Sequence, residues 1–187
     1  MKDSIVVKDT GSGDFQLPDA ALHNGVCTAV FDLGMQPGYQ GQIQHKVVIF
    51  WELAQKISDG GNYDGKRFVV SNTYTASLSD RANLRAMLES WRSRGFTPEE
   101  LEGFDIAVLR GVPCTISIVH NKSEKNGKTY GNISAVMKHD RDKGEALIPE
   151  LPDDWMPEWI QKKLDAPIAT APEDGGSSHD FDDEVPF

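Results

Sequence analysis

The first half of the chain alternates hydrophobic and polar positions in three long stretches. These are GVCTAVFDLG at 25–34, QIQHKVVIFWEL at 42–53 and KRFVVSNTYTASL at 66–78. Each is rich in β-branched and aromatic residues, and Pro-Gly or Gly-Gly turns separate them. We therefore predict three consecutive β-strands.

The period then changes from that of a strand to that of a helix. One apolar face recurs at i, i+3, i+4 and i+7, formed by Leu84, Met87, Leu88 and Trp91. Ser79 is the predicted N-cap of this helix, because its hydroxyl can accept a bond from the first turn. Thr97-Pro98-Glu99-Glu100 has the pattern of a capping box with proline at the first helical position, which predicts a second, short helix.

Two more strands are predicted around a tight turn. They lie at 113–121 and 128–138, and the Asn126-Gly127 pair between them is a strong hairpin signal. Three strands, a helix and two strands is the order of an OB-fold, although a generic β-barrel or an α+β sheet also fits. We expect an all-β, β-rich protein, a five-stranded OB-fold Greek-key barrel with the helix inserted between strands 3 and 4.

The predicted domain plan has three parts. Residues 1–150 form the OB-fold DNA-binding domain. Residues 151–165 form a short tryptophan-containing helical segment, which Asp153 caps and which lays Trp155 and Trp159 on the body. Residues 166–187 hold no Lys or Arg and are rich in Pro, Gly, Ser and Ala, so we expect a disordered acidic tail.

The formal net charge of −10 hides a separation of charge along the chain. Residues 151–187 carry 2 basic against 10 acidic side chains, whereas residues 41–143 carry 15 basic against 12 acidic. An acidic average therefore does not exclude a nucleic-acid partner for the basic middle of the chain.

An OB barrel commonly binds single strands on the face of its second and third strands, with aromatic side chains stacked on bases and cations on phosphates. The candidate DNA contacts on the predicted strands are Lys46, Trp51, Lys66, Arg67, Tyr74, Lys128 and Tyr130. Strand residues alternate between faces, so about half of the strand aromatics should instead be core. We expect Phe50, Phe68 and Trp91 in the core and leave Trp51, Tyr74 and Tyr130 open between core and platform.

Enzymatic chemistry finds little support in the sequence. DTGSGD lacks the lysine of a phosphate-binding loop, and the histidines and acids show no metal-ligand spacing. Cys27 and Cys114 are interpreted as small buried core residues, since neither has a histidine placed beside it by a known motif. We predict no catalytic residue, no metal and no cofactor.

The chain ends in HDFDDEVPF. This end resembles the acidic tip of bacterial single-stranded DNA-binding proteins, in which a run of aspartates is followed by an aliphatic residue, Pro and Phe. The resemblance implies a segment that docks into pockets of host replication and repair proteins. The residues carried over are Asp180, Asp182, Asp183, Glu184, Val185, Pro186 and Phe187. Glu184 and Val185 depart from the commonest Asp and Ile.

The body lacks the bacterial family's N-terminal strand signature. The stretch 67–114, RFVVSNTYTASLSDRANLRAMLESWRSRGFTPEELEGFDIAVLRGVPC, with the following KTYGNISAV, is instead similar to phage-encoded OB-fold single-stranded DNA-binding proteins. That resemblance implies a protein that coats single-stranded DNA in phage replication or recombination, inside the host bacterial cytoplasm. The same class forms dimers and tetramers, so homo-oligomers are a further expectation.

Two other functions remain alternatives at this point. One is an OB-fold protein–protein adaptor without strong DNA binding of its own, acting mainly through the tip. The other is a nuclease or strand-annealing enzyme, which no residue pattern favours. No apolar run is long enough for a membrane span, and MKDSIVVKD is not a signal peptide, so a membrane partner is not expected.

Overall fold

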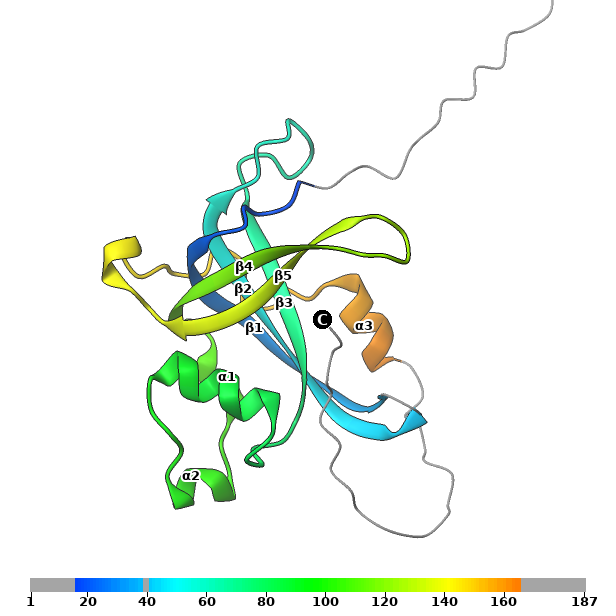
Figure 1. Ribbon diagram of the computed structural model, residues 1–187, viewed down its shortest axis with the longest axis vertical. Helices are drawn as coiled ribbons and strands as arrows, with labels where there is room; N and C mark the ends of the chain where they lie inside the picture. The colour runs from blue at the N-terminus through cyan, green and yellow to red at the C-terminus, as the bar shows by residue number, and fades with distance from the viewer. Residues whose placement is uncertain (1–15, 39–40, 166–187) are drawn as a thin grey trace, which may run out of the picture.

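The computed structural model describes residues 16–38 and 41–165. Five antiparallel strands form a single sheet (Figure 1). They are β1 (Leu22–Pro37), β2 (Ile43–Lys56), β3 (Arg67–Thr75), β4 (Pro113–Lys122) and β5 (Thr129–Lys138). All five predicted strands are thus confirmed, and β1 continues three residues beyond its predicted end into the segment expected to turn.

The strands lie in the order β3-β2-β1-β4-β5. β1 is the central strand, with β2 on one side and β4 on the other, so the chain crosses from β3 over to β4 through the inserted helices. β3 and β5 are the two edges, and within the described residues they form no ladder with each other. The β-rich class is therefore confirmed, while the sheet is not closed.

Irregular pairing curves this sheet. β1 carries register shifts between Cys27 and Ala29 and between Asp32 and Gly34, and β5 carries one between Ile133 and Ala135, opposite Ile118 and Ser117 of β4. Each inserted residue bends a strand and increases its twist. The curved sheet has an inner side that encloses the main core and an outer side that faces away from it.

The inner side of the sheet packs against α1 (Asn83–Arg92). The predicted apolar face of this helix is buried as expected, and it is formed by Leu84, Met87, Leu88 and Trp91. Trp91 packs beside Trp51 with ring centroids 6.0 Å apart, and its indole N–H donates to the carbonyl of Pro113 at 3.0 Å. The helix therefore contributes to the core that all five strands surround.

The helix ends only partly follow the predicted caps. α2 (Pro98–Glu102) has the predicted capping box on Thr97 and Glu100. The N-cap of α1 is Ala82, which makes no side-chain cap, so the prediction of Ser79 is wrong. The chain instead makes a turn from Ser79, whose carbonyl accepts from the Ala82 N–H, before the helix begins.

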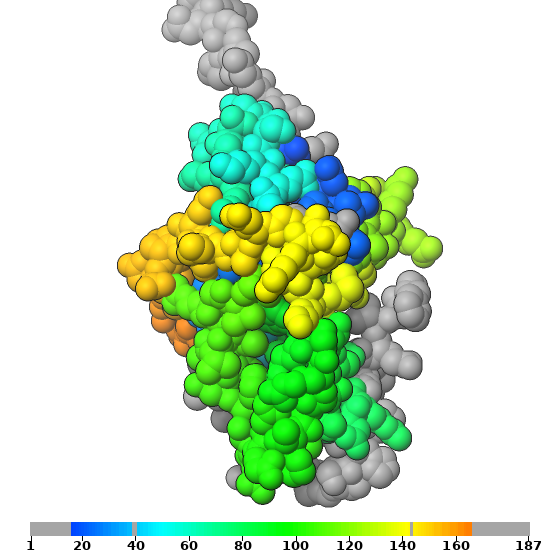
Figure 2. Space-filling model, turned by 90° about the vertical axis from the view of Figure 1, so that its left-hand side faces the viewer, coloured from blue at the N-terminus to red at the C-terminus, as the bar shows by residue number. Residues whose placement is uncertain are grey.

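The segment after β5 returns across the outer side of the sheet. A short 3₁₀ turn at Arg141–Lys143 is followed by an extended stretch and then by α3 (Glu158–Leu164). Figure 2 shows residues between β5 and α3, coloured yellow to orange, as a continuous band over one face of the molecule. We refer to residues 145–165 as the C-terminal strap.

The strap lies on the body, as predicted, but with a different anchor. Ile160 is the fully buried residue of α3, Trp155 is half-buried, and Trp159 remains 41% exposed. The N-cap of α3 is Pro157, so the prediction that Asp153 caps this helix is wrong. Asp153 lies four residues too early and pairs with Arg110 at 3.0 Å instead.

Candidate nucleic-acid interface

The outer side of β1 and β2 is apolar and covered. Phe50 on β2 makes edge-on ring contacts with Phe31 of β1 and Trp155 of the strap, with centroids 5.8 and 5.2 Å apart. The buried residues of this second cluster are Ala29, Leu33, Val48, Phe50 and Ile160. Because α3 and Trp155 occupy this surface, a DNA strand cannot reach it in this conformation.

A buried carboxylate fixes the strap to the sheet. Glu52 of β2 has no exposed surface, and its oxygens accept backbone N–H bonds from Glu150 and Leu151 at 2.9 to 3.1 Å. Arg67 of β3 lies 3.4 Å from the same carboxylate and 3.1 Å from that of Glu150. A buried charge persists only when it is paired and hydrogen-bonded, and here both conditions are met.

Three of the predicted DNA contacts have structural roles instead. Trp51 is 0% exposed and Tyr74 is 7% exposed, because both point to the inner side of the curved sheet. Burial raises the pKa of Tyr74 to about 12. Neither ring can stack on a base, so both assignments are corrected. Arg67 is corrected as well, since its guanidinium pairs with Glu52 and also donates to the Ile148 carbonyl at 2.8 Å.

Two predicted lysines lie at opposite ends of the β2–β3 pair. Lys46 is half-buried and donates to the hydroxyl of Thr75 at 2.9 Å. Lys66 is exposed and lies 5.3 Å from the ring centroid of Tyr63, a cation–π distance. The strand pairing places Lys46 beside the end of β3, whereas Lys66 precedes its start, so the two do not share one groove.

The remaining two predicted contacts lie together on the β4–β5 hairpin. Lys128 is exposed, and Tyr130 is 44% exposed with its hydroxyl accepting from the Asn126 amide at 2.8 Å. Two more lysines, Lys122 and Lys125, belong to the same hairpin. Among the described residues none of these three lysine ammonium groups forms an ion pair.

The hairpin holds the excess positive charge of the middle of the chain. Residues 113–138 contain four lysines and a single acid, Glu124, a net charge of +3. That equals the whole net charge of residues 41–143. The two strands themselves contain no Asp or Glu, so no carboxylate interrupts their outer face.

Three of the four arginines near α1 and α2 do not extend this charge, and the exception is Arg81, which is exposed and forms no ion pair among the described residues. Arg85 pairs with Asp80 and with Glu89 at 2.5 and 2.9 Å. Glu100 pairs with Arg94 at 2.8 Å and with Arg92, whose guanidinium also lies 4.5 Å from the ring centroid of Phe96. Their charge is neutralised locally, and the pKa of the Glu100 carboxyl is lowered to about 2, mainly by Arg94 and the Thr97 N–H.

Two observations concern metal binding and the cysteines within the described residues. No group of three or more His, Cys, Asp or Glu side chains in this part of the chain could hold a metal ion. Cys27 and Cys114 are both buried and free, as predicted, and burial raises the pKa of Cys27 to about 12. A thiol with so high a pKa is a poor nucleophile. No helix within the described ranges is long and apolar enough to cross a membrane.

The tip residues 180–187 lie outside the described residues, so their proposed role stays a prediction. No family model matches the chain, and no curated protein matches it either. The geometry and charge of the described surface therefore carry the functional argument.

The role of Glu52 was missed by sequence reasoning, although a signal for it exists. It is the one carboxylate in the apolar run VVIFWEL, and a charge at the centre of a buried strand needs partners. Its main partners lie 98 and 99 residues away, in a segment without regular secondary structure. Periodicity does not detect such a pairing.

Proposed function

We propose that this protein binds single-stranded DNA without sequence preference, through the outer face of the β4–β5 hairpin. One observation carries the proposal, namely that an exposed hairpin presents Tyr130 together with lysines that form no ion pair within residues 16–38 and 41–165. Cations supply the salt-dependent attraction to phosphates, and an exposed aromatic ring stacks on any base. We expected the groove on β2 and β3, but the strap covers the outer face of β2.

We further propose that the fold is an OB-fold. The strand order β3-β2-β1-β4-β5 is that of a five-stranded barrel opened between strands 3 and 5, and the helix between β3 and β4 stands where this fold places one. In that fold the loop between strands 4 and 5 is a common site for oligonucleotides. The charge on the β4–β5 hairpin supports the same location.

The test is a titration of a fluorescein-labelled dT oligonucleotide, followed by anisotropy over a range of salt concentrations. Trp51 and Trp91 are buried and neither lies on the hairpin, so intrinsic fluorescence is the poorer reporter. The double variant Lys125→Ala, Lys128→Ala removes two hairpin cations. The matched control Arg81→Ala, Lys163→Ala removes two exposed cations elsewhere that form no ion pair among the described residues.

We expect the hairpin variant to bind more weakly. The slope of log K against log salt concentration should also become shallower, by about 0.7 for each lost phosphate contact. The control should bind as the wild type does. Equal losses in both variants would show that affinity follows net charge rather than the hairpin.

Absence of binding by the wild-type chain would favour the adaptor alternative instead. In that case residues 180–187 would carry the function. Recruitment of host replication and repair proteins through these residues is part of the proposal, and we expect a peptide of this sequence to bind such proteins only with its terminal carboxylate free.

A further inference from the structure

A surface pocket lies at the end of the β4–β5 pair opposite the hairpin turn. It has a volume of about 550 Å³, within the range of small-ligand sites. The residues that line it are Pro113, His139, Arg141, Gly144, Glu145 and Ala146. Figure 1 shows the loop of residues 139–146 on the left of the sheet and the hairpin turn on the right.

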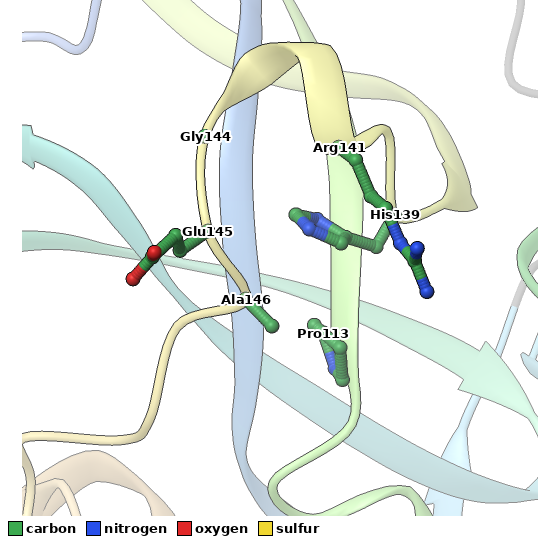
Figure 3. A pocket seen from close by; sticks show the side chains of 6 residues that line it. All are labelled: Pro113, His139, Arg141, Gly144, Glu145 and Ala146. Atoms are coloured by element: carbon green, nitrogen blue, oxygen red, sulfur yellow. The ribbon is translucent and has the colours of Figure 1, made fainter.

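A histidine ring forms part of the pocket wall. In Figure 3 the His139 ring points into the pocket, between Arg141 and Glu145, while the carboxylate of Glu145 points away from the ring. The Nδ1 atom of His139 is buried and forms no hydrogen bond with any described residue. Because that atom has almost no accessible surface, a ligand in the pocket contacts the rest of the half-buried ring.

The cationic group at this pocket is also available. Arg141 is exposed and forms no ion pair among the described residues. Asp140, its neighbour, uses its carboxylate to accept the Asp142 N–H at 3.0 Å. A guanidinium next to a half-buried imidazole and a proline ring combines a phosphate contact with two flat surfaces for a base.

The outer face of the hairpin leads toward the loop that borders this pocket, and that loop covers Thr115, which is 3% exposed. Ile133 packs in the inner core, so Tyr130 and Asn132 point outward by strand alternation. Farther along, the Ser134 hydroxyl lies 2.8 Å from that of Ser117 on β4. The Thr115 hydroxyl then accepts the Asp140 N–H at 2.9 Å, which brings the outer face to the pocket loop.

This face suits a polyanionic strand along its whole length. From Lys128 to Lys138 the strand rise gives about 30 Å, and the side chains between them are uncharged. The pocket therefore lies where a strand that starts at the hairpin and follows β5 would arrive.

We infer that the pocket is a nucleotide subsite at the far end of the DNA path, which rests on the proposed function. Arg141 contacts a phosphate there, and one base packs against the rings of His139 and Pro113. The hairpin and the pocket together then define the length of strand that one protein molecule holds.

The experiment measures the affinity of the full chain for dT oligonucleotides from about 4 to 16 nucleotides, the range of site sizes of single OB-folds. The variants are Arg141→Ala and His139→Gln, with Arg81→Ala as the matched exposed arginine and Lys128→Ala as the hairpin reference. Thermal unfolding checks that each variant remains folded.

We expect Arg141→Ala and His139→Gln to weaken binding of the long oligonucleotides about five-fold or more, and to leave the shortest ones unchanged. Affinity should therefore stop rising at a shorter length than in the wild type. Lys128→Ala should weaken binding at every length, and Arg81→Ala at none.

Two results overturn the inference, and they are distinguishable. In the first, both pocket variants bind oligonucleotides of every length as tightly as the wild type, while Lys128→Ala binds more weakly. This result rules out the pocket as a nucleotide subsite and leaves the proposed function intact. No binding of any oligonucleotide by the wild-type chain removes the proposed function and the pocket site together.

Discussion

The two halves of the sheet present opposite outer faces. The face of β1 and β2 carries Phe31 and Phe50, and the chain's own strap covers it. The face of β4 and β5 carries small polar side chains and Tyr130, and Lys128 lies at its hairpin end. The strap covers the first half, whereas the lysines of the second half form no ion pair with any residue that the structure describes.

This difference shows that aromatic residues and cations are not equally informative about a binding surface. An aromatic side chain buries 150–250 Å² and is more valuable to a core than any other residue. A lysine on a strand gains nothing from the core and must stay at the surface. The unpaired lysines are therefore the better guide to the interface, and the ion-paired arginines are a poor one.

The largest expected effect is on stability, and it concerns the contacts of Glu52 that hold the strap on the sheet. Glu52→Ala leaves two buried backbone N–H groups without their acceptor and removes one of the two carboxylates that pair with Arg67. Breaking a buried pair in this way costs about 3–5 kcal/mol. Denaturant unfolding measures the loss, and Glu124→Ala, an exposed acid on the hairpin, is the control that should change little. An equally stable Glu52→Ala variant would mean that the strap is held by its apolar contacts alone.

A pair of aromatic variants compares the two faces directly. Tyr130→Ala should weaken DNA binding by about 1–3 kcal/mol, the value of one stacked base. Trp159→Ala removes a ring of similar exposure from the covered face, 41% against 44%, and should leave affinity unchanged. Anisotropy titration measures both. The reverse ranking would place the strand on the strap and contradict the assignment of the open face.

The smallest expected effect concerns the acidic C-terminal residues. A chain that ends at Ala166 retains every contact of the strap and loses six acids. If these acids compete with DNA for the lysines, truncation tightens binding by a few-fold at low salt. The gain should vanish at high salt, because the screening length falls from about 30 Å at 0.01 M to about 3 Å at 1 M. Unchanged or weaker affinity at low salt would remove the competition hypothesis.

Much of the fold could be predicted because its strands and helices follow from patterns of neighbouring residues. The five strands follow from alternation and turn residues, and α1 follows from the spacing of Leu84, Leu88 and Trp91. The capping box of α2 follows from four consecutive residues. Each signal lies within a short stretch of sequence, so these elements could be predicted without knowledge of the tertiary structure. The structure confirms them.

The candidate site could be predicted only in part. The side of the sheet to which a side chain points, and the segment that covers it, depend on residues far away in the sequence. Trp51 and Val48 both lie in one apolar run, and the sequence does not say that one points to the inner core while the other is covered by α3. The same holds for Arg67, whose charge is used by Glu52 and Glu150. Lys128 and Tyr130, the latter left open between core and surface by the sequence, are both exposed beside the tight hairpin turn.

The position of the strap at the end of the described chain also affects which surfaces are exposed during synthesis on the ribosome. The last strand ends at Lys138, but the helix that covers Phe50 ends only at Leu164. At about 5–20 residues per second, the intervening 26 residues take about 1–5 s to synthesise. During that interval a nascent chain with a complete sheet exposes its aromatic outer face, with Glu52 still lacking its backbone donors. A chaperone that recognises apolar strands has this interval, before the strap emerges, in which to bind.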